Sequence, residues 1–164
     1  MTMKKTVFLL MAAVALTLAG CSANKSQGSA GEIPGLADAI ANKEYVINAN
    51  MMLPTSGPGK VLSSPYSIKV SGDRITSHLP YFGKAYSLPY GGGEGLIFEG
   101  TMTGYEVKYG RQGEAKINFS VRTDEDLYKF NLTIFPNGSS TISINPNNKQ
   151  SISFNGDAEP AGKQ

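Results

Sequence analysis

Alternation of apolar and polar residues runs through this chain from Tyr45 to Phe154. A period of two places successive side chains on opposite faces of a β-strand, so each alternating run predicts a strand with one buried face. The runs are Tyr45/Ile47/Ala49/Met51, Tyr66/Ile68/Val70, Ile75/Ser77/Leu79, Phe98/Gly100/Met102, Tyr105/Val107/Tyr109, Ile117/Phe119/Val121, Tyr128/Phe130/Leu132/Ile134, Ile142/Ile144 and Ile152/Phe154. These nine short strands predict an all-β domain.

One segment before the strands has a different period. Its apolar residues recur at helical spacing, and Pro34 stands where a first helical turn tolerates proline. The residues of this pattern are Ile33, Leu36, Ala37, Ile40 and Ala41. They predict one short helix, roughly Pro34 to Asn42.

Two turns set the register of the strands that flank them, because a correct hairpin places apolar residues opposite apolar residues. Gly72-Asp73 fits a two-residue loop. Pro136-Asn137-Gly138 fits a three-residue loop with Gly138 in the left-handed conformation. A two-residue loop there would place both isoleucines of the next strand opposite polar residues. The expected pairs are Val70 with Ile75, Leu132 with Ile142 and Phe130 with Ile144.

A third turn is expected at Thr103-Gly104. A two-residue loop there pairs Met102 with Tyr105 and places Glu99 opposite Lys108 on the outer face. With this turn included, the chain reads as a series of local hairpins.

Local hairpins with one apolar face predict an antiparallel up-and-down meander. We expect a closed, lipocalin-like β-barrel with one short N-terminal helix, and a sandwich-like closed meander is the alternative. Alternate loops of a meander share an end. The loops at 53–64, 80–95, 111–115 and 136–138 are therefore expected together, opposite the end where the helix enters.

The first residues have the three parts of a secretory signal: Lys4 and Lys5, an apolar run over 6–18, and small residues before Cys21. The run is shorter than the roughly 20 residues that span a bilayer. Leu18-Ala19-Gly20-Cys21 resembles the lipobox of bacterial lipoproteins, which implies that Cys21 is lipidated and becomes the first mature residue.

These patterns divide the chain into four parts. We expect a removed signal peptide over 1–20, a flexible tether over 21–33, a β-domain over 34–158 and a polar tail over 159–164. The tether is expected to be flexible because its Ser, Ala, Gly, Asn, Lys and Gln residues cannot form a core.

Composition excludes several classes of function. Without residues 1–20 the chain has 13 basic and 13 acidic side chains, which is not the basic footprint of a nucleic-acid-binding protein. Cys21 is the only cysteine, so neither a disulfide within the chain nor a cysteine zinc site can form. No cofactor is expected.

The sequence contains few residues in patterns typical of catalytic sites, and we expect that the protein is not an enzyme. His78 is the only histidine, and the register places it opposite Ser67 on the outer face. Asp124-Glu125-Asp126 lacks the spacing of a calcium loop and fits a polar turn. The glycine-rich 91–95 segment is not followed by the Lys-Ser/Thr of a phosphate loop. The hypothesis of a hydrolase is supported only by carboxylates that are scattered along the chain.

An aromatic segment interrupts the alternation between Leu79 and Gly93. It holds Tyr81, Phe82, Tyr86 and Tyr90 together with two prolines. These rings either plug the end of the barrel as core or form a binding rim for an apolar ligand or a partner protein.

Three segments resemble a known family. Leu79–Tyr86, Tyr66–Asp73 and Ile152–Gly156 are similar to the Bacteroidetes-type lipoprotein family of domain of unknown function 4251. The resemblance implies a lipocalin-like β-barrel envelope protein of unknown activity and supplies no catalytic residues.

The sequence therefore favours a lipid-anchored cell-envelope barrel that is a non-enzymatic binding module for a small apolar or amphipathic ligand. The alternative is a structural lipoprotein that docks on another envelope protein. By analogy with lipoprotein sorting, the absence of Asp after Cys21 favours the outer membrane, with the domain facing the periplasm. An internal cavity that opens at the aromatic loop would support ligand binding, and a filled interior would argue against a site there.

Overall fold

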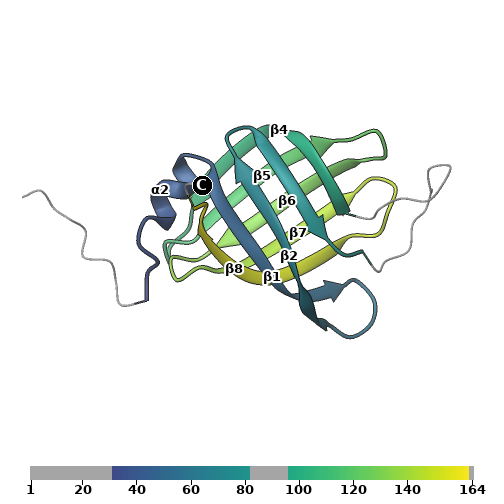
Figure 1. The fold of residues 1–164 in the computed structure, drawn as a ribbon, viewed down its shortest axis with the longest axis horizontal. Coiled ribbons are helices and arrows are strands. Elements are labelled where there is room, and N and C mark those ends of the chain that lie inside the picture. The colour runs from purple at the N-terminus through teal and green to yellow at the C-terminus, as the bar shows by residue number, and fades with distance from the viewer. Residues whose placement is uncertain (1–30, 82–95, 163–164) are drawn as a thin grey trace, which may run out of the picture.

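The computed structural model describes residues 31–81 and 96–162. Within these residues, eight antiparallel strands close into a barrel in chain order, and helix α2 covers one end (Figure 1). The elements are α2 (Leu36–Ala41), β1 (Glu44–Pro54), β2 (Lys60–Ser71), β3 (Arg74–Leu79), β4 (Leu96–Tyr109), β5 (Ala115–Arg122), β6 (Leu127–Ile134), β7 (Ser139–Pro146) and β8 (Ile152–Pro160). The predicted up-and-down barrel with one short helix is confirmed.

Helix α2 lies within the predicted range and buries one side on the barrel. Leu36, Ala39 and Ile40 are buried, whereas Ala37 and Ala41 of the predicted apolar set are exposed. Gly35 precedes the helix in the left-handed conformation, with φ of 79°. A helix this short depends on tertiary packing, because nucleation is too costly for six residues alone.

Stacked rings from β4, β5 and β6 fill the interior of the barrel. Tyr105 stacks on Phe119 at 5.9 Å between ring centroids, and Phe119 stacks on Phe130 at 4.9 Å. Towards the other end, Phe98 stacks on Tyr128 at 4.7 Å. These spacings are those of favourable aromatic pairs. Phe98 also lies edge-on to Phe130 at 6.3 Å, so packed rings connect the two ends of the barrel.

The turns at 72–73 and 136–138 have the predicted registers. All three predicted pairs, Val70 with Ile75, Leu132 with Ile142 and Phe130 with Ile144, are present. Gly138 has φ of 85°, in the left-handed region, as the three-residue loop requires. At the other end of the chain, β8 continues to Pro160, which pairs with Tyr45 and extends the barrel two residues past the expected boundary at 158.

The predicted hairpin at Thr103-Gly104 is wrong. β4 runs through these residues without a turn, and its pairing passes from Thr103↔Ser120 to Glu106↔Asn118, so β4 holds one extra residue. This is a β-bulge, with Gly104 at φ of 67°. A bulge and a two-residue hairpin shift the alternation equally, which is why the sequence pattern did not separate them.

The bulge also changes which loops share an end. With the false hairpin removed, the turns at 110–114 and 135–138 lie at the helix end, whereas the loop at 55–59, the end of β3 and the start of β4 lie at the other end. The prediction had placed these turns and the loops at 53–64 and 80–95 together. Glu99 accordingly lies opposite Thr76 of β3 and not opposite Lys108. In Figure 1 the helix end is on the left, and the far end, with the turns at 123–126 and 147–151, is on the right.

Candidate functional site

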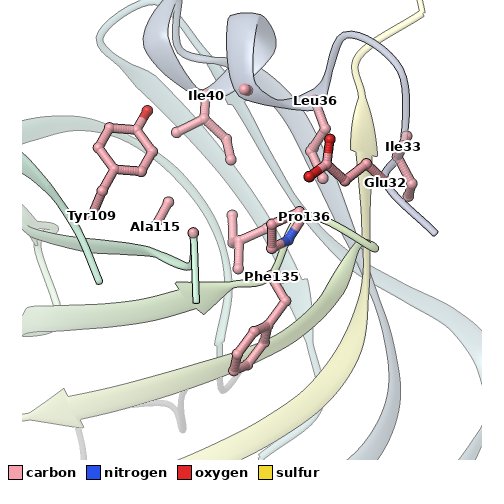
Figure 2. Close-up of a pocket in the computed structure, with 11 residues that line it drawn as sticks. Glu32, Ile33, Leu36, Ile40, Tyr109, Ala115, Phe135 and Pro136 are labelled. Carbon is pink, nitrogen blue, oxygen red and sulfur yellow. The ribbon is translucent and has the colours of Figure 1, made fainter. Parts of the chain in front are cut away.

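A cleft of about 230 Å³ lies between α2 and the adjoining ends of β4, β5 and β6 (Figure 2). Apart from Glu32 and Tyr109, its lining residues are apolar. Its lining residues are Glu32, Ile33, Leu36, Ala37, Ile40, Tyr109, Gly113, Ala115, Ile134, Phe135 and Pro136.

The cleft has a buried apolar wall on each side. Leu36 and Ile40 stand one helical turn apart and therefore point from the same face of α2. Ala115 and Ile134, paired across β5 and β6, form the barrel side. All four are almost fully buried. The small side chain of Ala115 leaves room that a larger residue would occupy.

The segment that leads into α2 is fixed to the turn at 135–138. The Ile33 amide donates a hydrogen bond of 2.9 Å to the Pro136 carbonyl, and the Ala158 amide donates one of 2.7 Å to the Gly138 carbonyl. A Cβ on Gly138 would stand 2.8 Å from the Ala158 carbonyl oxygen and closer still to Ile33 Cδ1. This close approach of chain segments sets one wall of the cleft.

Polar groups stand at the edge of the cleft. Glu32 is exposed, and Tyr109 is 59% exposed. The two side chains lie on opposite sides of the cleft (Figure 2). They are the ionisable side chains among its described lining residues.

Two tyrosine hydroxyls lie beneath α2. Tyr45 and Tyr105 are joined at 3.3 Å between their oxygens, and the Tyr105 hydroxyl donates to the Ile40 carbonyl at 3.5 Å. Burial raises the pKa of Tyr45 well above its ordinary value, and Tyr105 adds to the effect; burial also raises the pKa of Tyr105. Both phenols are therefore neutral at physiological pH and connect the helix to the barrel.

The far end is closed by different chemistry, which centres on Asp126. This carboxylate is 5% exposed and accepts hydrogen bonds from the amides of Leu127 at 2.7 Å, Asn147 at 3.1 Å and Asn148 at 3.0 Å. Asp124 of the same turn is exposed. The predicted polar turn is present, but Asp126 is a buried link between the turns at 123–126 and 147–151.

Lys149 is also buried at the far end, with 4% exposure. Its ammonium lies 3.3 Å from Glu125 Oε2 and 3.3 Å from the Tyr128 hydroxyl. Burial by itself would lower the pKa of Lys149, but the bonds to Tyr128 and Glu125 outweigh burial and raise it. Among the described residues, no group of three His, Cys, Asp or Glu side chains is placed to hold a metal ion.

Tyr81 is the residue of the predicted binding rim that the structure describes, and it does not line the cleft. Tyr81 lies at the far end, half-buried, and its hydroxyl donates to the Gln150 carbonyl at 2.9 Å. Phe82, Tyr86, Tyr90 and the lipidation candidate Cys21 lie outside the described residues, so these remain predictions. His78 is exposed on β3 opposite Ser67, as predicted.

Sequence reasoning missed the cleft because it placed the turns at 110–114 and 135–138 at the wrong end. The signal was present in two parts. The helical pattern included Leu36 and Ile40, and alternation placed Ile134 on the inner face. Only the uninterrupted course of β4 brings these parts together.

The fold and the site define a small antiparallel β-barrel with a helix over one end and an apolar cleft beneath that helix. Residues 29–158 match the family described as Domain of unknown function (DUF4251), and the chain belongs to this family. No helix within 31–81 and 96–162 is long and apolar enough to span a membrane.

Comparison with solved structures gives the same fold. The chain is similar to the crystal structure of a DUF4251 family protein from Bacteroides eggerthii DSM 20697, with 22% identity and a TM-score of 0.60. The match covers 80% of this chain and 91% of that one. The comparison with curated proteins gave no match.

Proposed function

We propose that this protein is a non-enzymatic, lipid-anchored binding module of the cell envelope that takes a small apolar or amphipathic ligand into the cleft beneath α2. The apolar walls of this cleft carry the proposal. Apolar pockets with a few polar groups at the edge are the usual form of small-molecule sites, because burial of apolar surface supplies affinity and the polar groups supply orientation.

The size of the cleft limits the ligand. An apolar cavity of about 150 Å³ holds benzene in a well-studied case, and drug-sized ligands occupy about 300 Å³ or more. At about 230 Å³, the cleft suits a single ring or a short alkyl chain. A longer chain would extend past the edge into solvent or membrane.

The position of the cleft relative to Cys21 supports a membrane-linked role. Glu32, at the edge of the cleft, follows Cys21 by eleven residues. The composition of residues 22–31 predicts a flexible tether, and a tether of that length spans about 20 Å on average. A lipid on Cys21 would therefore hold the helix end close to the bilayer surface, where amphipathic molecules gather. The location we propose is the outer membrane, facing the periplasm.

The alternative, docking on another envelope protein, has less support. The large apolar side chains that are exposed on the described strands include Val61 on β2 and Ile97 on β4. Isolated exposed apolar residues are normal on soluble domains and do not by themselves mark an interface.

Ligand binding can be tested with N-phenyl-1-naphthylamine, a neutral dye that fluoresces in apolar sites. Ala37 lines the cleft from an exposed position on α2, so Ala37→Trp fills the cleft without burying a new side chain in the core. Ala41→Trp is the matched control on the same helix, and Ala41 does not line the cleft.

We expect the wild type and Ala41→Trp to bind the dye equally, and Ala37→Trp to bind it about tenfold more weakly, a loss of about 1.4 kcal/mol. No dye binding by the wild type, or equal binding by all three proteins, would overturn the cleft as the ligand site.

Anchoring is tested separately by Cys21→Ala. We expect the variant to leave the membrane fraction while the barrel stays folded, because the tether separates Cys21 from the core. Fractionation after a high-salt wash and circular dichroism of the released protein give the two readouts. A variant that still sediments with membranes would refute the anchor.

A further inference from the structure

Resting on the proposed function, we infer that the ligand of the cleft is a cationic amphiphile: a short apolar group that carries an amine or alkylammonium head. The walls of the cleft select the apolar part. The groups at its edge select the charge of the head, and both of them favour a cation.

Glu32 provides the first argument. It is the carboxylate among the described lining residues, and its side chain is exposed at the edge of the cleft. A ligand whose tail lies between α2 and the barrel must leave its head at this edge. A cationic head there gains Coulomb attraction, whereas a fatty-acid carboxylate would be repelled.

Tyr109 provides the second argument, from the opposite side of the cleft (Figure 2). Its ring is 59% exposed and presents a π surface. Aromatic faces attract ammonium groups and have no such attraction for carboxylates. Whichever side the head takes, the group that it meets favours positive charge.

Two basic groups of neighbouring segments are already paired with carboxylates. Lys43 forms an ion pair of 2.6 Å with Asp73, and Lys116 lies 3.5 Å from Glu114. Arg111, in the turn after β4, is exposed and is not a lining residue. The edge itself therefore has a negative group on one side and an aromatic ring on the other.

The experiment compares three amphiphiles with the same octyl chain: octyltrimethylammonium, nonanoate and octyl glucoside. Each competes with N-phenyl-1-naphthylamine below its micelle-forming concentration, on wild type, Glu32→Gln and Asp124→Asn. Asp124 is exposed in the turn at the far end and does not line the cleft, so its variant removes the same charge as a control.

We expect octyltrimethylammonium to displace the dye at about three- to fivefold lower concentration than nonanoate, which is the size of one exposed charge interaction. Glu32→Gln should reduce this ratio and leave the smaller preference due to Tyr109, and Asp124→Asn should leave the ratio unchanged. The ratio should also shrink as salt rises above about 0.15 M.

The outcomes separate the two claims. If nonanoate competes as well as the cation, or if Glu32→Gln leaves the ratio unchanged while Ala37→Trp weakens the binding of all three amphiphiles, the cationic preference is wrong and the cleft remains a ligand site. If no amphiphile and no dye binds the wild type, the proposed function and this inference both fail.

Discussion

The two ends of the barrel are closed by opposite kinds of chemistry. At the helix end, Leu36 and Ile40 cover the barrel with apolar surface, and neutral tyrosine hydroxyls join the helix to β1 and β4. At the far end, the carboxylate of Asp126 and the ammonium of Lys149 are buried and held by hydrogen bonds and an ion pair.

The difference shows which end suits an apolar ligand. A buried charge must keep its partners, because breaking such a set costs about 3–5 kcal/mol. An apolar closure can leave a gap at the smaller cost of lost packing contacts. The far end also has a cleft, of about 210 Å³, but Thr123, Asp124 and Glu125 contribute polar groups to its lining. The cleft at the helix end is the one with apolar walls.

The largest expected effect is at the far end. Asp126→Ala leaves three backbone amides without their acceptor, and we expect a loss of about 3 kcal/mol in the free energy of unfolding. Asp124→Ala, two residues away and exposed, should stay within about 0.5 kcal/mol of wild type. Urea denaturation measures both.

Equal losses for the two aspartates would contradict the contrast between the ends, since Asp126 would then be an ordinary turn residue. If Asp126→Ala loses the expected free energy of unfolding but still binds the dye, the contrast between the two ends becomes sharper. That result would show that the far end stabilises the barrel without forming part of the ligand site.

A smaller effect is expected at the helix end, where two turn glycines both have positive φ. Gly72 has φ of 57° and open space around an added Cβ, whereas a Cβ on Gly138 would press on the Ala158 carbonyl. Asn tolerates the left-handed region, so Gly72→Asn should cost less than about 0.5 kcal/mol. Gly138→Asn should cost about 2 kcal/mol from crowding.

Thermal denaturation of the two variants distinguishes crowding from backbone conformation. A Gly138→Asn variant as stable as Gly72→Asn would show that the segment at Ile33 moves away easily. The wall of the cleft would then be less fixed than the hydrogen bond from Ile33 to Pro136 indicates.

Most of the fold could be predicted from sequence because alternation and turn chemistry are local signals. Gly138 shows this: its position, the proline two residues earlier and the isoleucines of β7 together fixed the register that the structure has. The bulge at Gly104 could not be predicted in the same way. It shifts the alternation as a hairpin does, and only the pairing with β3 and β5 distinguishes them.

The candidate site was less predictable, because it depends on contacts between distant segments. Asp126 looks like any turn aspartate until the turn at 147–151 brings amides to it, and Lys149 has no local signal of burial. Ile33 and Pro136 are about a hundred positions apart in the chain, yet one hydrogen bond joins them beside the cleft. A single error in the course of β4 was enough to separate these residues in the prediction.

The smallest expected effect concerns the tyrosine pair at the helix end. The pKa of Tyr45 is raised above its ordinary value of 10.0, so above pH 10 the unfolded chain loses this proton while the folded protein keeps it. Stability should therefore fall as pH rises above 10, with a slope from this residue of up to about 1.4 kcal/mol per pH unit.

Tyr45→Phe should cost about 1 kcal/mol at pH 7, from the lost hydrogen bond, and should flatten the alkaline slope. Urea denaturation between pH 8 and 12 measures the slopes. A Tyr45→Phe slope equal to that of wild type would assign the alkaline loss to other groups, including Lys149 at the far end, whose raised pKa also makes its contribution disappear as pH rises.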